Sequence, residues 1–328
     1  MFDLISIGDT TLDTFLELED ANVFCDLDKN NCQLCINYAD KIPVKSVAQA
    51  IGGNAANVAV GTSRLGLKTA LVSIVGDDPI GQQLSQKLKA EKVASDYIVV
   101  DKGKKTNNST ILNLRGERTI LIYHEVRDYC LNLNLGKTKF AYITSMKDGW
   151  ECMMAKEGLF DWIDEHQIRV AYNPGTYQIK AGIANSAPLL QKTEILFVNK
   201  QEARNWLKLD TNDFGALGRG LIKYGPKIVV ITDGENGSYA ITDKDMIHQE
   251  IYKTQKIEAT GAGDAYASAF ISAIASGESI EQAMRWGSLN SASVISEIGS
   301  QAGLLSRDKM EKRLKFQISK TNPPPPVS

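Results

Sequence analysis

Short apolar runs alternate with segments of helical periodicity along most of the chain, and this alternation constrains the fold more than any other feature. Six runs predict buried parallel strands: Leu4–Gly8, Ala70–Gly76, Tyr142–Ser145, Val170–Asn173, Ile195–Asn199 and Ile228–Thr232. Helices are predicted over Ala55–Leu65, Pro79–Glu91, Cys152–Glu165, Lys200–Leu207 and Phe214–Tyr224. We therefore predict an α/β fold with a doubly wound, mostly parallel sheet that is flanked by helices.

Two stretches interrupt the alternation, at about residues 12–47 and 96–124. In the second, Ser109–Leu114 and Arg118–Tyr123 flank Arg115-Gly116-Glu117, which is typical of a β-hairpin. Together the two stretches predict a small β-sheet standing off one domain that covers residues 1–318. Residues 319–328 include the proline-rich segment Asn322–Ser328 and are predicted to be a disordered tail.

Composition excludes several classes of protein. A formal net charge of -2 argues against a nucleic-acid-binding protein, which usually carries a basic surplus. No apolar run is long enough to span a membrane. The N-terminal segment MFDLISIGD lacks the basic start of a signal peptide, so we expect a cytoplasmic protein.

The chain has 5 cysteines, and three of them cluster at Cys25, Cys32 and Cys35. Cys32 and Cys35 have the C-x-x-C spacing of half a zinc site, but no second pair of cysteines or histidines supplies the other two ligands. We therefore predict free, reduced cysteines, and their role stays open.

One loop carries the strongest signal for chemistry: Gly261, Ala262 and Gly263, followed by Asp264. Residues 265–276 have helical spacing, so the loop lies at a helix N-terminus. Unpaired backbone N–H groups and the helix dipole favour an anion there, and the small side chains let a phosphate approach closely. Asp264 could accept the proton of an attacking hydroxyl. An aspartate that only complements the helix dipole would give the same pattern.

Polar groups near the start of the chain suit a hydroxylated ligand. Gly52, Gly53, Asn54 and Asn57 open a predicted helix, where glycines allow close approach and amides can bond to hydroxyl groups. Asp13 follows the first strand and could accept two hydrogen bonds from a diol. Taken alone, the glycine and asparagine motif is better explained by a capped helix start, and an Asx turn would explain Asp13.

Two later strand ends suit a nucleotide and its metal ion. Asn199 and Glu202 form N-x-x-E, and Glu202 could hold water around Mg²⁺, although a capping box has the same pattern. Thr232, Gly234 and Gly237 could reach phosphates through a hydroxyl and backbone N–H groups, or could form a hairpin turn.

In this order, these motifs resemble the ribokinase-like (PfkB-type) carbohydrate kinase family over residues 2–300. The resemblance implies an ATP-dependent kinase that phosphorylates a hydroxyl of a small sugar, with Asp264 as base and Gly261–Gly263 as anion hole. It implies substrate contacts at Asp13, Gly52, Gly53, Asn54 and Asn57. It implies contacts with ATP and Mg²⁺ at Asn199, Glu202, Thr232, Gly234 and Gly237, with Glu202 supporting the metal. The two irregular stretches would form a lid that also joins a homodimer.

The chain departs from the family at Ala259, where an aspartate usually helps to bind a monovalent cation. This departure puts activation by K⁺ in doubt, although carbonyl groups of the loop could still bind a cation weakly.

Several alternatives stay open. A nucleoside kinase would need an aromatic slot, for which Phe15, Phe24, Tyr38 and Tyr123 are candidates. A kinase of phosphorylated sugars would need lid cations; these candidates are Arg115, Arg118 and Arg127. A relative that binds sugar or nucleotide without catalysis is a third possibility. A dinucleotide-dependent oxidoreductase is disfavoured because the chain has no G-x-G-x-x-G after the first strand, and no Walker A loop occurs either.

Overall fold

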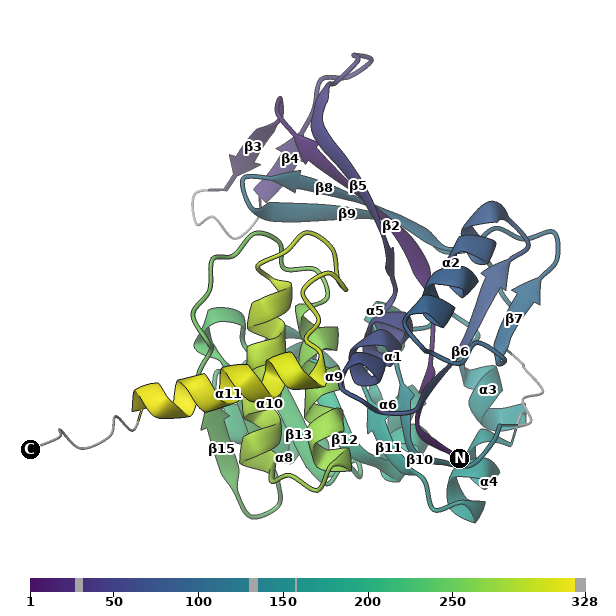
Figure 1. Cartoon of the computed structure of the whole chain (residues 1–328), viewed down its shortest axis with the longest axis vertical. Helices are drawn as coiled ribbons and strands as arrows, with labels where there is room; N and C mark the ends of the chain where they lie inside the picture. The colour runs from purple at the N-terminus through teal and green to yellow at the C-terminus, as the bar shows by residue number, and fades with distance from the viewer. Residues whose placement is uncertain (27–31, 130–134, 157, 322–328) are drawn as a thin grey trace, which may run out of the picture.

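The structure is a computed structural model that describes residues 1–26, 32–129, 135–156 and 158–321. A nine-stranded sheet in the order β15-β14-β13-β12-β11-β10-β1-β6-β7 forms the main body (Figure 1). The strands from β13 to β7 are parallel, and β14 and β15 add an antiparallel edge. The strands are β1 Phe2–Ile7, β6 Thr69–Gly76, β7 Ile98–Asp101, β10 Thr138–Ile143, β11 Arg169–Tyr172, β12 Thr193–Asn199, β13 Ile228–Thr232, β14 Ser238–Ile241 and β15 Met246–Gln249.

Helices cover both faces of this sheet because successive strand residues point to opposite sides. In β1, Ile5 and Ile7 enter one core and Leu4 enters the other. The first core is covered by α3 Glu151–Lys156, α4 Leu159–Glu165, α5 Thr176–Ala181, α6 Ile183–Lys192, α7 Lys200–Leu207 and α8 Phe214–Ile222. The second is covered by α1 Asn54–Arg64, α9 Ala262–Ala275, α10 Ile280–Val294 and α11 Arg307–Thr321, while α2 Pro79–Ala90 packs beside α1 and β6. The predicted fold class is confirmed.

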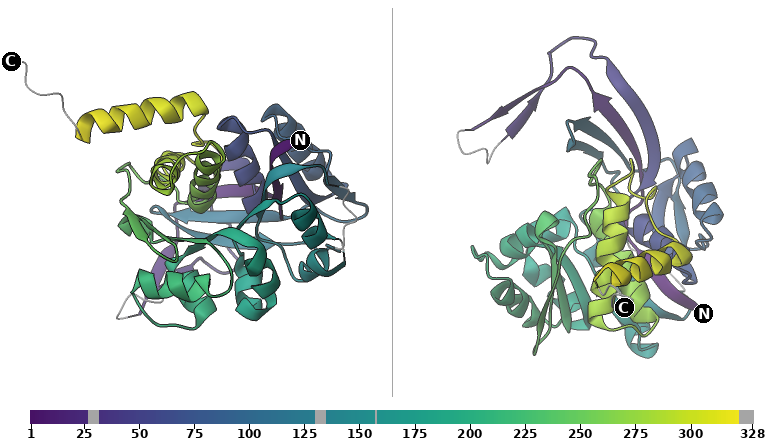
Figure 2. Two further views of the ribbon diagram at one scale, coloured as in Figure 1. Left: turned by 90° about the horizontal axis from the view of Figure 1, so that it is seen from below. Right: turned by 60° about the vertical axis from the view of Figure 1, so that its left-hand side comes forward.

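A second, four-stranded sheet in the order β5-β2-β8-β9 stands off the main body, and we call it the lid (Figures 1 and 2). Its strands are β2 Thr11–Leu18, β5 Val44–Gly52, β8 Asn108–Leu114 and β9 Glu117–Tyr123. A separate two-stranded hairpin, β3 Asn22–Cys25 and β4 Cys32–Cys35, extends from its far end (Figure 2). The expected strand pair around Arg115-Gly116-Glu117 is present as β8 and β9.

Three boundaries differ from those expected. The single helix expected over Cys152–Glu165 is two helices, α3 and α4, because Gly158 adopts a left-handed conformation with φ of 66° at the start of α4. Residues Ile98–Asp101, inside the expected lid stretch 96–124, form β7 and pair with β6 of the main sheet. Helix α11 continues to Thr321, past the boundary expected at residue 318, while Asn322–Ser328 lies outside the described residues.

The prediction of free cysteines is wrong for Cys25 and Cys32. These residues face each other across β3 and β4 and form a disulfide, and Cys152 is also disulfide-bonded. Cys35 is free. The described residues contain no cluster that could hold a metal ion, so the zinc reading of Cys32 and Cys35 gains no support.

The helices of the described segments are too short or too polar to cross a bilayer.

Candidate active site

Two hollows meet at the loop before α9. The first, of about 560 Å³, lies between the lid and the ends of the parallel strands. The second, of about 480 Å³, lies between the β13–β14 turn and α10. Both are lined by Thr232, Ala259, Ala262, Gly263 and Tyr266. We call them the lid pocket and the outer pocket; the shared loop would put a group bound in one within reach of the other.

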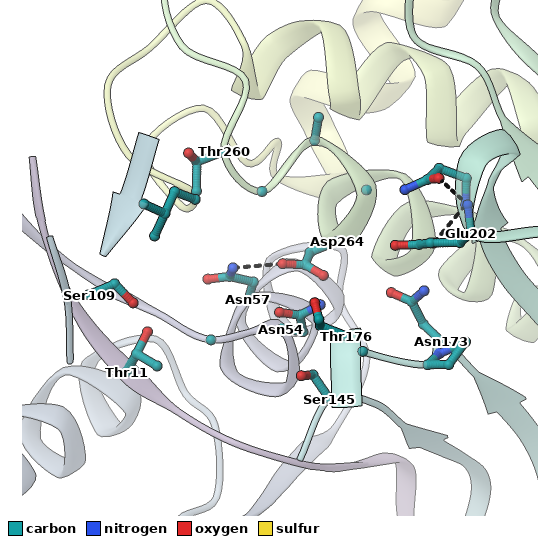
Figure 3. Close-up of a pocket in the computed structure, with 18 of the residues that line it drawn as sticks. Thr11, Asn54, Asn57, Ser109, Ser145, Asn173, Thr176, Glu202, Thr260 and Asp264 are labelled. Carbon is teal, nitrogen blue, oxygen red and sulfur yellow. Dashed lines mark hydrogen bonds between the residues drawn. The ribbon is translucent and has the colours of Figure 1, made fainter. Parts of the chain in front are cut away.

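Asp264 lies at this junction, in the first turn of α9 and almost fully buried at 7% exposure (Figure 3). Burial is the main cause that raises its pKa to about 6. A hydrogen bond from Asn57 Nδ2 to Asp264 Oδ2, 2.8 Å long, opposes that rise, while the charges of Asp13 and Glu202 add to it. A carboxyl with this pKa is ionised at neutral pH and is basic enough to accept a proton.

The Asp13 carboxylate lines the lid pocket, and its surroundings hold it in place. Asp13 is buried, its Oδ1 accepts a 2.8 Å hydrogen bond from Thr11 Oγ1, and burial raises its pKa. A side chain at Gly52 would collide with the Asp13 carboxylate. Gly52 therefore lies behind the pocket wall and makes room for Asp13, rather than lining the pocket itself.

The start of α1 supplies three of the predicted substrate residues to the lid pocket: Gly53, Asn54 and Asn57. Gly53 has φ of 89°, and a Cβ there would run into the backbone of residues 9–11. Only glycine fits this approach without strain. Figure 3 shows Asn54 and Asn57 beside Asp264, with Thr11 and Ser109 toward the lid.

The loop before α9 has the form of an anion site. Gly261 caps the helix in a left-handed conformation with φ of 81°, and no side chain of the described residues caps this end. A Cβ on Gly261 would collide with Ser300, and one on Gly263 would meet open space. The first N–H groups of α9 therefore face the junction without a side chain in the way.

Sequence reasoning missed Glu258 beneath this loop. Its side chain is 2% exposed, and its Oε1 accepts a 2.6 Å hydrogen bond from the Thr260 N–H. Within the described segments, Glu258 Oε2 and Thr260 Oγ1 are buried and have no partner. A buried carboxylate thus lies next to the position where Ala259 lacks one.

Asn199 and Glu202 lie at the carboxyl end of β12 and form a complete capping box. The Asn199 side chain accepts from the Glu202 N–H, and Glu202 accepts from the Asn199 N–H, both at 2.8 Å. Both residues line the lid pocket, and burial raises the pKa of Glu202. The predicted capping box is present, and it leaves the second carboxylate oxygen of Glu202 outside the capping bond.

Thr232 ends β13 and lines both pockets, whereas Gly234 and Gly237 line the outer pocket. A short 3₁₀ turn at Gly234–Asn236 leads into the antiparallel strand β14, so the motif forms the turn that was the alternative to phosphate binding. Apolar groups of Ile251, Ala292 and Ile295 line the outer pocket beyond these glycines.

Other wall residues were not singled out from the sequence, although some could have been. Ser145 and Asn173 are the last residues of two predicted strands, at the sheet edge where ligands bind in such folds (Figure 3). Thr176, Tyr177 and Lys180 belong to α5, a six-residue helix too short to give a periodic signal.

The structure separates the residues that were candidates for binding a nucleoside base or a phosphorylated sugar into those that line a pocket and those that do not. Phe15 is buried in the lid, and none of Phe15, Phe24, Tyr38 and Tyr123 lines either pocket in the described structure. Arg118 lines the lid pocket. Arg115 occupies the β8–β9 turn with φ of 54°. Arg127 is buried and paired with Asp101 at 3.4 Å.

Comparisons with known proteins agree on one family. Residues 20–307 match the profile of the pfkB family of carbohydrate kinases. A 5-dehydro-2-deoxygluconokinase of Bacillus thuringiensis (strain Al Hakam) is 32% identical over 276 residues, which cover 77% of this chain and 82% of the relative.

Two solved structures share the fold. Arabidopsis thaliana ribokinase, solved with ribose and ATP, superposes with a TM-score of 0.79 at 20% identity over 96% of this chain and 99% of its own. The nucleoside kinase of Methanocaldococcus jannaschii superposes with a TM-score of 0.77 at 22% identity, over 96% and 99%.

Proposed function

The chain belongs to the pfkB family of carbohydrate kinases, phosphotransferases that act on a hydroxyl group, and on that premise we propose that it transfers the γ-phosphoryl group of ATP to a hydroxyl of a small sugar or sugar derivative. One observation carries the proposal. Asp264 is a buried carboxylate with pKa raised to about 6, at the junction of two pockets and in the first turn of α9. This is where a base and an anion-binding helix end can act on the same phosphoryl group.

In the proposed reaction the acceptor occupies the lid pocket and ATP the outer pocket. The acceptor hydroxyl oxygen attacks the γ-phosphorus, its proton passes to Asp264, and the bond to the leaving ADP oxygen breaks. The N–H groups at residues 261–263 stabilise the charge on the transferring group. Asp13, Gly53, Asn54 and Asn57 orient the acceptor, with Gly52 giving Asp13 its place. Most of the acceleration then comes from positioning and electrostatics.

ATP and its metal fit the residues at the ends of β12 and β13. Thr232 and the backbone at Gly234 and Gly237 would bind phosphates, and the apolar wall at Ile251 and Ile295 suits an adenine ring. Glu202 and Asn199 would hold Mg²⁺ through water, since Glu202 keeps one oxygen outside its capping bond. When bound, Mg²⁺ neutralises phosphate charge.

Potassium activation is an open part of the proposal. The unpaired Glu258 Oε2 is a suitable oxygen ligand for a monovalent cation beside the loop, in place of the group that Ala259 lacks. Assays with KCl and with NaCl at equal ionic strength test this.

A sugar is favoured over a nucleoside as acceptor. The aromatic residues that could have formed a base slot do not line the lid pocket in the described structure. The Bacillus relative is named for 5-dehydro-2-deoxygluconate, so sugar acids belong in the first panel beside neutral sugars, sugar phosphates and nucleosides.

The test is ADP release from ATP and Mg²⁺ in the presence of that panel, for the wild type and for Asp264→Asn. We expect at least one acceptor to be phosphorylated, and we expect Asp264→Asn to lower kcat by about 10²- to 10⁴-fold, the range supplied by a positioned base. Asp243→Asn, an exposed residue on the β14–β15 turn, is the matched control and should keep wild-type activity. Full activity in Asp264→Asn would refute the role of the base.

We also propose that the chain forms a homodimer through the lid, whose outer strands carry exposed apolar side chains. The cytoplasmic location stays a prediction. Use of ATP supports it, whereas the Cys25–Cys32 disulfide is a bond that a reducing cytoplasm disfavours.

A further inference from the structure

Two positively charged side chains line the lid pocket: Lys180 of α5 and Arg118 of β9. One belongs to the main body and the other to the lid. Neither takes part in an ion pair among the residues that the structure describes. Cations that face a ligand pocket without a protein partner are available to a ligand.

The orientation of Lys180 follows from its helix. Tyr177 lies three residues earlier in α5, so the two side chains share one helix face, and both line the lid pocket. The Tyr177 ring packs against the His124 ring with 6.0 Å between their centroids. Burial and the charges of Lys147 and Arg127 lower the pKa of His124, so this residue adds a neutral hydrogen-bonding group to the same wall.

Lys180 and Arg118 form no ion pair with Asp13, Glu202 or Asp264, the carboxylates that line the same pocket. The charges that shift the pKa of Asp264 are those of Asp13 and Glu202, and both raise it. The opposing influence on Asp13 comes from hydrogen bonds with Thr11 and Ser109. We call Lys180 and Arg118 the basic wall of the lid pocket, which is also lined by the carboxylates Asp13, Glu202 and Asp264.

Lysine and arginine can donate hydrogen bonds to the hydroxyls of a neutral sugar, but only an anionic group also compensates their charge. The carboxylates of the pocket alone would repel such a group. Building on the proposed kinase function, we propose that the acceptor carries an anionic group, a carboxylate or a phosphate, which Lys180 and Arg118 bind while the reacting hydroxyl lies at Asp264. Because Arg118 belongs to the lid and Lys180 to the body, the anionic group would also hold the lid over the site.

The experiment compares matched acceptors that differ in charge: D-gluconate with D-glucitol, and D-fructose 6-phosphate with D-fructose. ADP release is measured for the wild type, Lys180→Met, Arg118→Met and Lys180→Arg. Lys223→Met, an exposed lysine at the end of α8 that lines neither pocket, is the control. Binding of the same four compounds is measured by calorimetry in the presence of a non-hydrolysable ATP analogue.

We expect the wild type to favour one anionic acceptor over its neutral partner, in turnover or in binding, by at least about tenfold. Lys180→Met and Arg118→Met should each reduce that preference about ten- to hundredfold, the worth of one charge-assisted hydrogen bond, mainly through KM of the anionic acceptor. Lys180→Arg should keep most of the preference for the anionic acceptor, because the positive charge is retained. The carboxylate pair and the phosphate pair distinguish the two sources of negative charge.

A wild type that prefers or equally accepts the neutral members, or a preference that survives in both methionine variants, overturns the inference. In that case Asp264-dependent turnover of a neutral sugar would still uphold the kinase function. If none of the four compounds is turned over, calorimetry decides: absence of selective binding of either anion counts against the basic wall, whereas selective binding that is lost in Lys180→Met supports it. Failure of the whole acceptor panel would instead count against the proposed function.

Discussion

At the scale of single residues, Asn57 holds three partners at once. Its Nδ2 donates to Asp264, and its Oδ1 accepts from Ser300 Oγ and from Gln301 Nε2, each at 3.0 Å. The amide is thereby fixed with its donor toward the carboxylate, which favours the ionised form of Asp264. One side chain thus orients the proposed base and lowers its pKa against the effect of burial.

We predict that kcat/KM of the wild type falls as the pH is lowered through about 6, because a protonated Asp264 cannot accept the proton of the acceptor. The Asn57→Ala change removes the hydrogen bond that lowers the pKa of Asp264. The acid limb of the pH profile should therefore move to higher pH, and the loss of activity should be larger at pH 6 than at pH 8. Initial rates of ADP release across this range measure the limb.

Asn54→Ala is the control for this prediction. Asn54 lines the same pocket from the same helix but has no bond to Asp264, so its removal can weaken acceptor binding without moving the limb. The comparison matters because burial also raises the pKa of Asp9 to about 6. An acid limb that stays in place in Asn57→Ala would assign it to a group other than Asp264.

Sequence reasoning found Asp264 and Asn57 because each lies in a small-residue motif beside a helix start. It could not find their contact, since the two residues are 207 positions apart and only the packing of α1 on α9 joins them. Nor could it separate Gly52 from Gly53, because that distinction rests on which backbone approaches which carboxylate. Lys180 was not predicted as a site residue because its helix, α5, is too short to give a periodic signal.

At the scale of elements, close packing of α1 against α9 brings Asn57 to Asp264. Gly61 lies one turn further along α1, and a Cβ there would collide with the Ser268 side chain of α9. Ser268 is fully buried and bonded to the Ala265 carbonyl, so it has little freedom to move away. The helices can approach this closely only because position 61 has no side chain.

We predict that Gly61→Ala lowers the free energy of unfolding by about 1–3 kcal/mol, the usual effect of overpacking a core. It should also lower kcat, because α1 moves away from α9 and lengthens the contact between Asn57 and Asp264. Urea unfolding and ADP release measure the two effects.

The matched control is Gly220→Ala in α8. A Cβ there would meet only the flexible end of Leu207, so improved helix propensity should leave stability unchanged or raise it by up to about 1 kcal/mol. Equal behaviour of the two variants would mean that α1 and α9 do not pack as closely as described.

Elements were predictable where local pattern and tertiary burial agree. The six predicted strands all belong to the parallel part of the main sheet. Strands β14 and β15 were not predicted, and they are short and lie at the antiparallel edge. Helix α10 was not predicted either, although its Trp286 and Leu289 are buried against α9. The prediction of free cysteines was wrong because only a metal site at Cys32 and Cys35 was weighed against it, and strand pairing could not be read from the sequence. In a strand, Cys32 and Cys35 point to opposite faces, and the true partner of Cys32 comes from the paired strand β3.

At the scale of the whole molecule, the lid presents apolar groups on the side away from its pocket. In β9, Ile120 and Ile122 line the pocket, so Leu121 and Tyr123 point outward, where they are 56% and 42% exposed. Val47 of β5 is 60% exposed. Exposed apolar side chains on the outer face of a sheet are typical of an association face, and an edge strand such as β9 can pair with another chain.

We predict that the wild type sediments as a dimer of two 36.0 kDa chains at micromolar concentration. Leu121→Glu should weaken that dimer at least about a hundredfold, because association would bury an unpaired charge at the lid face. Met246→Glu makes the matched change at a side chain that is 53% exposed on β15, far from the lid in sequence and sheet, and should leave the dimer intact. Sedimentation equilibrium gives the masses directly. If the wild type is a monomer throughout, or if both variants dissociate alike, the lid is not the association face, and its exposed side chains must then be covered in another way.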